Sequence, residues 1–324
     1  SGLSNCRSQG AFDIAKTGLS MLDASTRIES SIALTRIGGQ EPAQILDWAV
    51  KCDNWRVRQT SAFSFGSHNV PAALDRMRFL LRDTNPFVRQ AAVSAFVDIP
   101  GAAFTELTSF LNDPAPQVRL EASRILGASL PGDAGLFEPF IKLAGADPDI
   151  FVRSSATSFL GGFHQPQATA LIEQNMHSDY WPLRQGAVLA AGRSDSPNLI
   201  SPLTSALVDS NEFVRRNAAL ALGGQLQTHP NLVSPLMQAI RTDNDPFTRH
   251  ILASALLSVP SQQQLMENQA FIQQALIPGI RIEGWSKEVS PPPETGIEIC
   301  YSPLLGPIKH TFLVANSPEG SKAI

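Results

Sequence analysis

An arginine returns along the sequence at a nearly constant spacing, and this spacing limits the folds that the chain can adopt. Successive members lie 31, 31, 30, 34, 31, 31 and 34 residues apart. They are Arg27, Arg58, Arg89, Arg119, Arg153, Arg184, Arg215 and Arg249. A fixed period in this range is the mark of stacked supersecondary units, each of which buries its apolar side only against the next. The sequence therefore predicts a repeat array rather than one compact core.

Other residue types keep a fixed register with these arginines. A small residue follows by three positions in seven of eight repeats, and glycine follows by eight positions in five. An aromatic residue precedes the arginine by two or three positions in six repeats. An aspartate precedes it by four to six positions in every repeat: Asp23, Asp53, Asp83, Asp113, Asp147, Asp179, Asp209 and Asp243.

This register predicts a helix, a turn and a second helix in each unit. Aspartate caps helices because its carboxylate accepts backbone N–H bonds, and proline suits a first helical turn. Small residues at the third position allow close approach between neighbouring helices. The late glycines, such as Gly161 and Gly192, are expected to end the second helix in a left-handed conformation.

The combined pattern D-x-x-x-x-VR-x-x-A-x-x-x-L-G resembles HEAT repeats over residues 11 to about 260. The short period and the "VRxxAxxALG" form are most similar to the subgroup known from phycobilisome lyases. The resemblance implies an all-α, armadillo-like fold, a right-handed α-solenoid (superhelix) of about eight helical hairpins. It also implies that the eight arginines form a structural ladder, each pairing with an aspartate of its own or a neighbouring turn.

The chain is expected to have three parts. Residues 1–10 form a flexible N-terminus, 11–277 the solenoid, and 278–324 a C-terminal extension of irregular and β structure. The Gln-rich stretch 261–277 reads as a helix that caps the last repeat, and 296–302 and 310–316 read as two strands. Two strands cannot form a stable domain alone, so they dock on the solenoid or begin a truncated second domain.

The second helices are expected to line the concave side of the solenoid. Their open positions lie one, two and five residues after each arginine, opposite the apolar stripe. Only four of these 24 positions are charged, two of them acidic and two basic. A weakly charged, partly apolar groove suits a protein or peptide, whereas nucleic acid would need many basic contacts. The candidate binding residues are Gln59, Phe63, Gln90, Leu120, Arg124, Gln185, Leu189, Arg216 and His250.

Catalytic and metal-binding patterns are missing from the sequence. There is no CxxC, HExxH, P-loop or GxSxG pattern, so no metal, cofactor or catalytic residue is predicted. Cys300 and His310 fall on the two expected strands, but a third catalytic group is not in view. Trp48 and Trp181 are interpreted as packing residues. The three separated cysteines favour reduced thiols in the cytoplasm, and no apolar run approaches a membrane span.

The favoured function is a non-enzymatic scaffold for protein–protein interaction on the concave face. Two alternatives stay open. One is a bilin-lyase-like or chaperone-like enzyme, which only the form of the repeat suggests. The other is the HEAT-repeat portion of a larger multidomain protein, such as a secreted effector, whose activity lies in the C-terminal region.

Overall fold

The computed structural model describes residues 9–19, 47–67, 73–258 and 268–277, the single positions 21, 26, 30 and 33, and the pairs 297–298 and 314–315. Several positions singled out in the sequence lie outside these residues: 1–8, Asp23, Arg27, Cys300 and His310. The chain divides into two compact units, Ser1–Leu130 and Pro131–Ile324. The regular elements among the described residues are helices, apart from one pair of two-residue strands.

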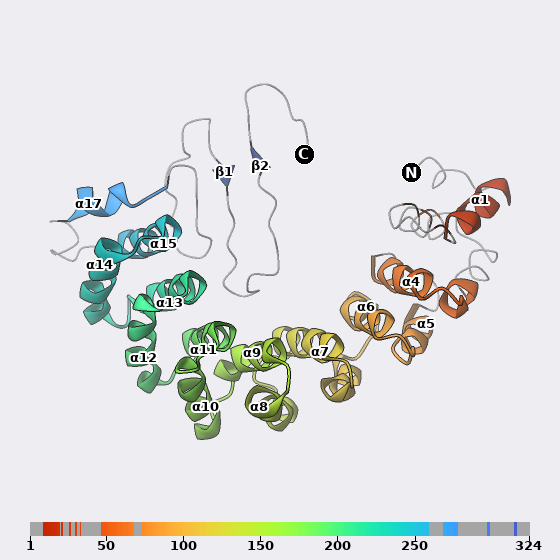
Figure 1. Cartoon of the computed structure of the whole chain (residues 1–324), viewed down its shortest axis with the longest axis horizontal. Coiled ribbons are helices and arrows are strands. Elements are labelled where there is room, and N and C mark those ends of the chain that lie inside the picture. Colours follow the sequence, from red (N-terminus) through yellow and green to blue (C-terminus); the bar gives the residue numbers. More distant parts are fainter. Residues whose placement is uncertain are drawn as a thin grey trace. The chain divides into compact units, whose positions relative to one another are not determined.

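The first unit contains a helical stretch at residues 47–51 and six helical elements with defined bounds. They are α1 (Gln9–Leu19), α4 (Trp55–Ser67), α5 (Ala73–Leu80), α6 (Pro86–Phe96), the 3-10 helix η2 (Phe104–Asn112) and α7 (Pro116–Ser129). Helix α4 packs on both α5 and α6, and α6 packs on α7. The second helices of successive hairpins, α4, α6 and α7, are therefore neighbours within this unit (Figure 1).

The second unit continues the same alternation. Its first helices are α8 (Phe137–Ala146), α10 (Pro166–Met176), α12 (Ile200–Ser205) and α14 (Val233–Thr242). Its second helices are α9 (Ile150–Phe159), α11 (Trp181–Arg193), α13 (Glu212–Gln225) and α15 (Pro246–Leu257). Short 3-10 turns join or extend them: η3 (Ala134–Leu136), η4 (Leu160–Gly162), η5 (Pro197–Leu199), η6 (Ala206–Val208) and η7 (Pro230–Leu232).

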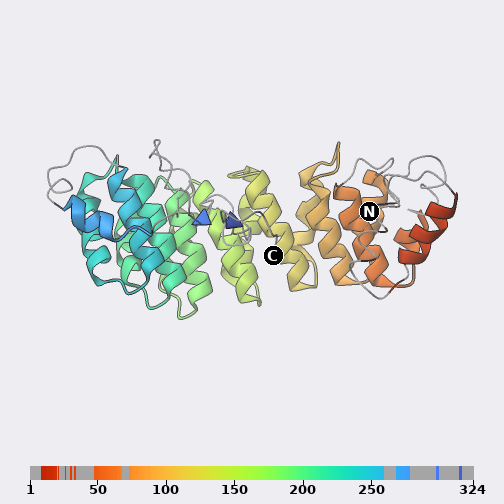
Figure 2. The ribbon, with the colours of Figure 1, turned by 90° about the horizontal axis from the view of Figure 1, so that it is seen from above.

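The helices of the second unit form two layers. Helices α9, α11, α13 and α15 pack side by side in one layer, and α8, α10, α12 and α14 form the other (Figures 1 and 2). Figure 1 shows this double row curving, with the layer of second helices on the inside of the curve. Every second helix of this unit therefore has one side that faces the inside of the curve. Its N-terminal end follows the turn that joins it to the first helix.

Capping side chains explain where the second helices begin. Asn85, Asp149 and Asn211 each accept a hydrogen bond from the backbone N–H two residues ahead, at 2.9 Å. Asp245 accepts from the Thr248 N–H at 2.8 Å, three residues ahead. Such bonds satisfy N–H groups that have no partner inside the helix. The Asp- and Asn-rich turns seen in the sequence thus set the register of the helices that follow.

The small residues three positions after the arginines lie in the core. All are at most 6% exposed: Ser30, Ser61, Ala92, Ala122, Ala156, Ala187 and Ala218. Larger side chains seven positions after the arginine fill the space between layers, among them Phe65, Phe96 and Leu126, all fully buried. Alternation of small and large side chains lets helices approach closely without leaving voids.

The prediction that the late glycines adopt a left-handed conformation is wrong. The positive-φ glycines among the described residues are Gly101 and Gly132, both in loops. Gly161 and Gly192 instead lie against the next second helix. A Cβ at Gly161 would meet the Ala190 carbonyl oxygen, and one at Gly192 would lie 2.7 Å from the Ala221 Cβ. Glycine recurs there because neighbouring backbones approach too closely for a side chain.

The C-terminal part is described at three places. Helix α17 (Gln269–Gln274) falls within the helix expected over 261–277, and it contacts α15. Strands β1 (Ile297–Glu298) and β2 (Val314–Ala315) pair antiparallel, with Ile297 opposite Ala315. Each lies inside one of the two expected strands. None of the helices in the described residues is long and apolar enough to cross a membrane.

Candidate interaction surface

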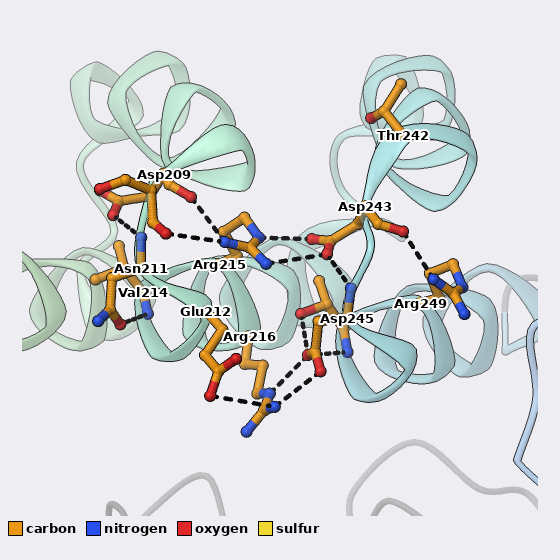
Figure 3. Close-up of polar contacts among 12 residues, drawn as sticks. Asp209, Asn211, Glu212, Val214, Arg215, Arg216, Thr242, Asp243, Asp245 and Arg249 are labelled. Atoms are coloured by element: carbon orange, nitrogen blue, oxygen red, sulfur yellow. Dashed lines mark hydrogen bonds and ion pairs between the residues drawn. The ribbon is translucent and has the colours of Figure 1, made fainter.

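Arginines of the predicted ladder bind the aspartate in the following turn. Arg89 holds Asp113 through two bonds of 2.8 Å, and Arg184 holds Asp209 through two of 2.7 Å. Arg58 pairs with Asp83 in the same way. Arg215 pairs with Asp243 at 2.7 and 3.1 Å (Figure 3). Two parallel bonds between a guanidinium and a carboxylate fix both groups in one geometry.

The same aspartate also binds the arginine of its own repeat, through its backbone. The Asp243 carbonyl accepts from Arg249 at 2.8 Å, while its carboxylate takes Arg215 (Figure 3). The Asp113 carbonyl likewise accepts from Arg119 at 2.9 Å. The Asp243 carboxylate further accepts the Asp245 backbone N–H, at 2.7 Å, which shapes the turn. Arginines and aspartates thereby form continuous polar chains, from Arg58 to Arg119 in the first unit and from Arg184 to Arg249 in the second.

The paired aspartates all lie six positions before the arginine of their own repeat. After Arg153, that position holds Ser178, and Asp179 comes one residue later. Asp179 is exposed, and Arg153 Nε is buried without a hydrogen-bond partner among the described residues. A shift of one residue thus removes the pairing, although the sequence keeps an aspartate in the turn.

Ion pairing shifts the pKa values of these groups. Hydrogen bonds that the arginines donate to a carboxylate raise their pKa values. The pairs are Arg58 with Asp83, Arg89 with Asp113, Arg184 with Asp209 and Arg215 with Asp243. Burial alone would raise the pKa of Asp209, but bonds from Arg184 and from the Asn211 N–H outweigh it and lower the value. The charged forms are therefore favoured across the neutral pH range.

The two basic residues expected on the open face are also paired. Arg124 binds Glu121 at 2.5 Å on its own helix. Arg216 binds both oxygens of Asp245, at 2.7 and 2.8 Å, and lies 3.8 Å from Glu212 (Figure 3). Asp245 also accepts from Thr248, and these bonds lower its pKa despite its burial. Positive charge on this face is thus neutralised within the chain.

The other candidate residues differ in exposure. The Phe63 side chain is 47% exposed, and the remaining uncharged candidates are half-buried: Gln59, Gln90, Leu120, Gln185 and Leu189. His250 is only 3% exposed, because it faces the end of the α17 segment, where the Ile277 N–H donates to its Nδ1 at 3.0 Å. Its Nε2 is buried without a hydrogen-bond partner, and burial lowers its pKa.

The aromatic residues that precede the arginines by two or three positions are more exposed than packing residues would be. Phe87, Phe151, Trp181, Phe213 and Phe247 are 39–56% exposed at the N-terminal ends of second helices. Trp181, expected to pack inside, stacks on Phe213 with ring centroids 5.8 Å apart. Trp55 stacks on Phe87 at 5.5 Å. The signal was the regular position of the aromatics next to polar turns, where side chains reach the surface.

A shallow pocket of about 520 Å³ lies between α10 and the segment that follows α11. Its lining includes His164, Glu173, Asp195 and Asn198, which are exposed polar side chains. The described residues contain no cluster of three or more His, Cys, Asp or Glu side chains that could hold a metal ion. This pocket therefore has polar groups but no built metal site.

Comparison with protein families matches HEAT repeats at residues 42–103, 104–190 and 169–257. The chain belongs to the HEAT-repeat family. The matched ranges include seven of the eight arginines, so the expectation of HEAT repeats, drawn from their register, is confirmed. No curated protein matches this HEAT-repeat chain.

Three solved structures show similarity to this chain. One chain comes from the complex in which Kap95p binding induces the switch loops of RanGDP to adopt the GTP-bound conformation. It is 13% identical with a TM-score of 0.51, and the match covers 84% of this HEAT-repeat protein and 44% of that chain. Human deoxyhypusine hydroxylase in complex with glycerol is 19% identical, with a TM-score of 0.34 and coverage of 79% and 98%. An engineered protein is 18% identical, with a TM-score of 0.44 and coverage of 85% and 92%. At 13% identity, the likeness to the chain of the Kap95p complex shows the fold alone.

Proposed function

We propose that this HEAT-repeat protein is a non-enzymatic scaffold whose second helices bind a protein or peptide on their inward side. HEAT repeats commonly mediate protein–protein interaction. The binding residues in this proposal are the exposed Phe63 and the half-buried Gln59, Gln90, Leu120, Gln185 and Leu189. Arg124 and Arg216 contribute as members of ion pairs, and His250 contributes only from beneath the surface.

One observation carries the proposal: the two basic residues at the open positions of this side already have carboxylate partners. Arg124 is held by Glu121, and Arg216 is held by Asp245. Nucleic-acid binding depends on many cations that are available to phosphates, and each such contact contributes to affinity. A surface of amide and apolar side chains with neutralised charges instead resembles a protein-binding interface. Nucleic acid is therefore a poor candidate for the partner.

Several finer points belong to the same proposal. They are the right-handed winding, the count of about eight hairpins, the division at residues 10 and 277, and the cytoplasmic location. The likeness to phycobilisome-lyase repeats suggests a bilin ligand as the enzymatic alternative. Titration of the protein with a free bilin tests this alternative, because binding in a protein pocket changes the absorbance spectrum of the pigment. An unchanged spectrum would leave the scaffold as the simpler reading.

The experiment for the scaffold is affinity capture with the full chain as bait and the Phe63→Glu variant beside it. The proposal expects a protein partner that the wild type retains and the variant loses, because a carboxylate on the binding surface disrupts apolar contact. Phe79→Glu is the matched control, since Phe79 is 50% exposed on α5, a first helix. Equal capture by all three proteins would contradict inward-side binding.

A further inference from the structure

The arginine ladder contains a pairing in which serine replaces the aspartate. We call a rung the pair formed by one ladder arginine and the residue six positions before the next ladder arginine. Four rungs hold an aspartate whose side chain is only 2–11% exposed: Arg58–Asp83, Arg89–Asp113, Arg184–Asp209 and Arg215–Asp243. At the rung of Arg153 this residue is Ser178. Arg153 Nε is buried and has no hydrogen-bond partner among the described residues, which costs free energy.

The backbone around Ser178 keeps the geometry of the filled rungs. Its Oγ accepts the Tyr180 N–H at 3.2 Å, as the Asp209 carboxylate accepts the N–H two residues ahead at 2.8 Å. Its carbonyl accepts from Arg184 at 2.9 Å, and the Asp209 carbonyl accepts from Arg215 at the same distance. Ser178 therefore shapes its turn as the aspartates do, but it supplies no negative charge.

The helices beside this rung also follow the order of the filled rungs. Arg153 lies on α9, and Ser178 precedes α11, which packs on α9. In the same unit, Arg215 lies on α13, and Asp243 precedes α15, which packs on α13 (Figure 3). There the guanidinium holds the carboxylate through bonds of 2.7 and 3.1 Å. An oxyanion attached at position 178 is therefore expected to meet the Arg153 guanidinium.

Acidic groups near this rung do not exclude a further anion. Asp149 caps α9, and Asp179 is exposed in the turn before α11. The filled rung of Arg215 has similar surroundings. Its hydrogen bond to Asp243 is the first of the interactions that raise the pKa of Arg215, and the charges of two further acids add to it. A rung with several acids nearby thus still holds its carboxylate.

The missing anion is best supplied by position 178 itself. The carboxylates of the filled rungs are largely closed to solvent, and so is Arg153 Nε. Serine can carry a phosphoryl group, which at neutral pH brings a charge of about −1.5 to −2 and three acceptor oxygens. Such a group forms charge-assisted hydrogen bonds with a guanidinium. Ser178 is half-buried between the exposed His177 and Asp179, so its turn is accessible to a modifying enzyme.

We propose that Ser178 is a phosphorylation site and that its phosphoryl group completes the rung with Arg153. A serine/threonine protein kinase transfers the group from a nucleoside triphosphate. A bond forms between Ser178 Oγ and the γ-phosphorus, and the bond from this phosphorus to the bridging oxygen breaks. The Oγ proton passes to the base of the kinase, and nucleoside diphosphate leaves. The inference goes beyond the scaffold function, since it concerns the link between α9 and α11 and requires no partner.

The first test uses the full chain with phosphoserine incorporated at position 178, and the Ser178→Asp variant beside it. Both changes are expected to raise the melting temperature by about 2–6 °C, because each supplies an acceptor for the buried Arg153 N–H. Arg153→Gln is the matched background, in which neither change should raise it. No rise in the wild-type background, or an equal rise in both backgrounds, would overturn the pairing.

Phosphorus-31 NMR gives a measurement that a purely structural effect would not move. The second pKa of phosphoserine is about 6, and a guanidinium beside the group favours the dianion. The full chain is therefore expected to titrate about 0.5–1 pH unit below the isolated phosphopeptide of residues 174–182, which keeps the local acids but lacks Arg153. This comparison needs no variant to fold, and equal pKa values would contradict the proposal.

A last pair of measurements separates phosphorylation from binding of a free anion. Mass spectrometry of the full chain isolated from the cells that make it is expected to find phosphate on Ser178, and the Ser178→Ala variant should lose this signal. Inorganic phosphate added to the unmodified chain should change the melting temperatures of the wild type and Arg153→Gln equally. An unmodified Ser178 in those cells, or free phosphate that stabilises the wild type as much as phosphoserine does, would overturn the assignment.

Discussion

At the scale of single residues, one aspartate connects two successive repeats in four of the turns: Asp83, Asp113, Asp209 and Asp243. Its carboxylate holds the arginine before it, and its carbonyl accepts from the arginine after it, as at Asp243. The Asp243 side chain is 2% exposed, and that of Arg215 is 17% exposed. Removal of one member of such a pair leaves the other charge buried without compensation, which costs more than the pair contributes when both are present.

Arg215→Ala is therefore expected to lower the free energy of unfolding by about 2–3 kcal/mol. Arg78→Ala is the comparison, because the Arg78–Glu106 pair makes the same two bonds but its side chains are 44% and 32% exposed. Exposed pairs contribute little, so this variant should unfold almost as the wild type does. Urea denaturation of both variants measures the difference, and similar losses would argue against a role for burial.

His250 gives the protein a pH dependence below neutrality. Burial lowers the pKa of His250, and its Nδ1 accepts the Ile277 N–H, so the folded state favours the neutral ring. The unfolded chain binds the proton with an ordinary pKa of about 6.5. Stability from this residue is thus complete above that pH and declines as the pH falls through about 6.5 toward the lower folded value.

His250→Asn should flatten the decline in melting temperature between pH 8 and pH 5, because the amide oxygen can accept the Ile277 N–H but does not titrate. Replacement of the exposed His177 by asparagine is the control, and its melting curves should follow the wild type. A wild-type melting temperature that is constant over this range would contradict the assignment. The stability contributed by the Asp209 carboxylate is lost only at lower pH, since the pKa of this group is lowered.

At the scale of elements, the helical hairpins could be predicted because caps, apolar positions and small residues share one register. The glycines were misread, since sequence spacing cannot tell a helix end from a contact between backbones. His250 was misplaced for a related reason. The position of His250 one residue after Arg249 predicts that it lies on the open face. In the structure the Ile277 N–H contacts its ring, and periodicity within the repeats does not predict this contact. The aromatic side chains are exposed because they lie beside the turns at the surface, and the periodicity of the sequence does not predict the direction of those turns.

Close approach between second helices predicts opposite effects for two glycines. Gly161→Ala should destabilise the protein by about 1–3 kcal/mol, because the new methyl group meets the Ala190 carbonyl oxygen. Gly224→Ala on α13 has no atom within 4 Å of the added Cβ, and it should stabilise by about 0.5 kcal/mol through reduced freedom of the unfolded chain. Thermal unfolding of both variants checks the signs, and equal signs would contradict the packing account.

At the scale of the whole molecule, contacts run mainly between adjacent helices in each unit. Helix α11 packs on α9 and α13, and α13 packs on α11 and α15. Stability in such an array is a sum of repeat terms and nearest-neighbour terms, so damage to one repeat spreads only to its neighbours. Each unit contains buried leucines, Leu107 and Leu111 in the first and Leu203 and Leu236 in the second.

Leu107→Ala should therefore raise amide hydrogen exchange in η2, α6 and α7 but leave α13–α15 close to wild type. A buried leucine truncation removes about 2–5 kcal/mol, enough to open the local repeats. Exchange followed by mass spectrometry resolves these segments. A uniform rise along the chain would show that the array unfolds as one cooperative body instead.

The bridging aspartate and the arginine of its own repeat keep a constant separation in the sequence, and this limits where the repeats can vary in length. The repeats differ by up to four residues in spacing, from 30 to 34, yet the bonded aspartates all lie six residues before their arginines. Arg153 shows that a one-residue offset breaks the bridge. Insertions should therefore survive selection in the links between one hairpin and the next, such as residues 97–103, and be eliminated from the turn inside a hairpin. Guest sequences grafted for engineering belong in those links.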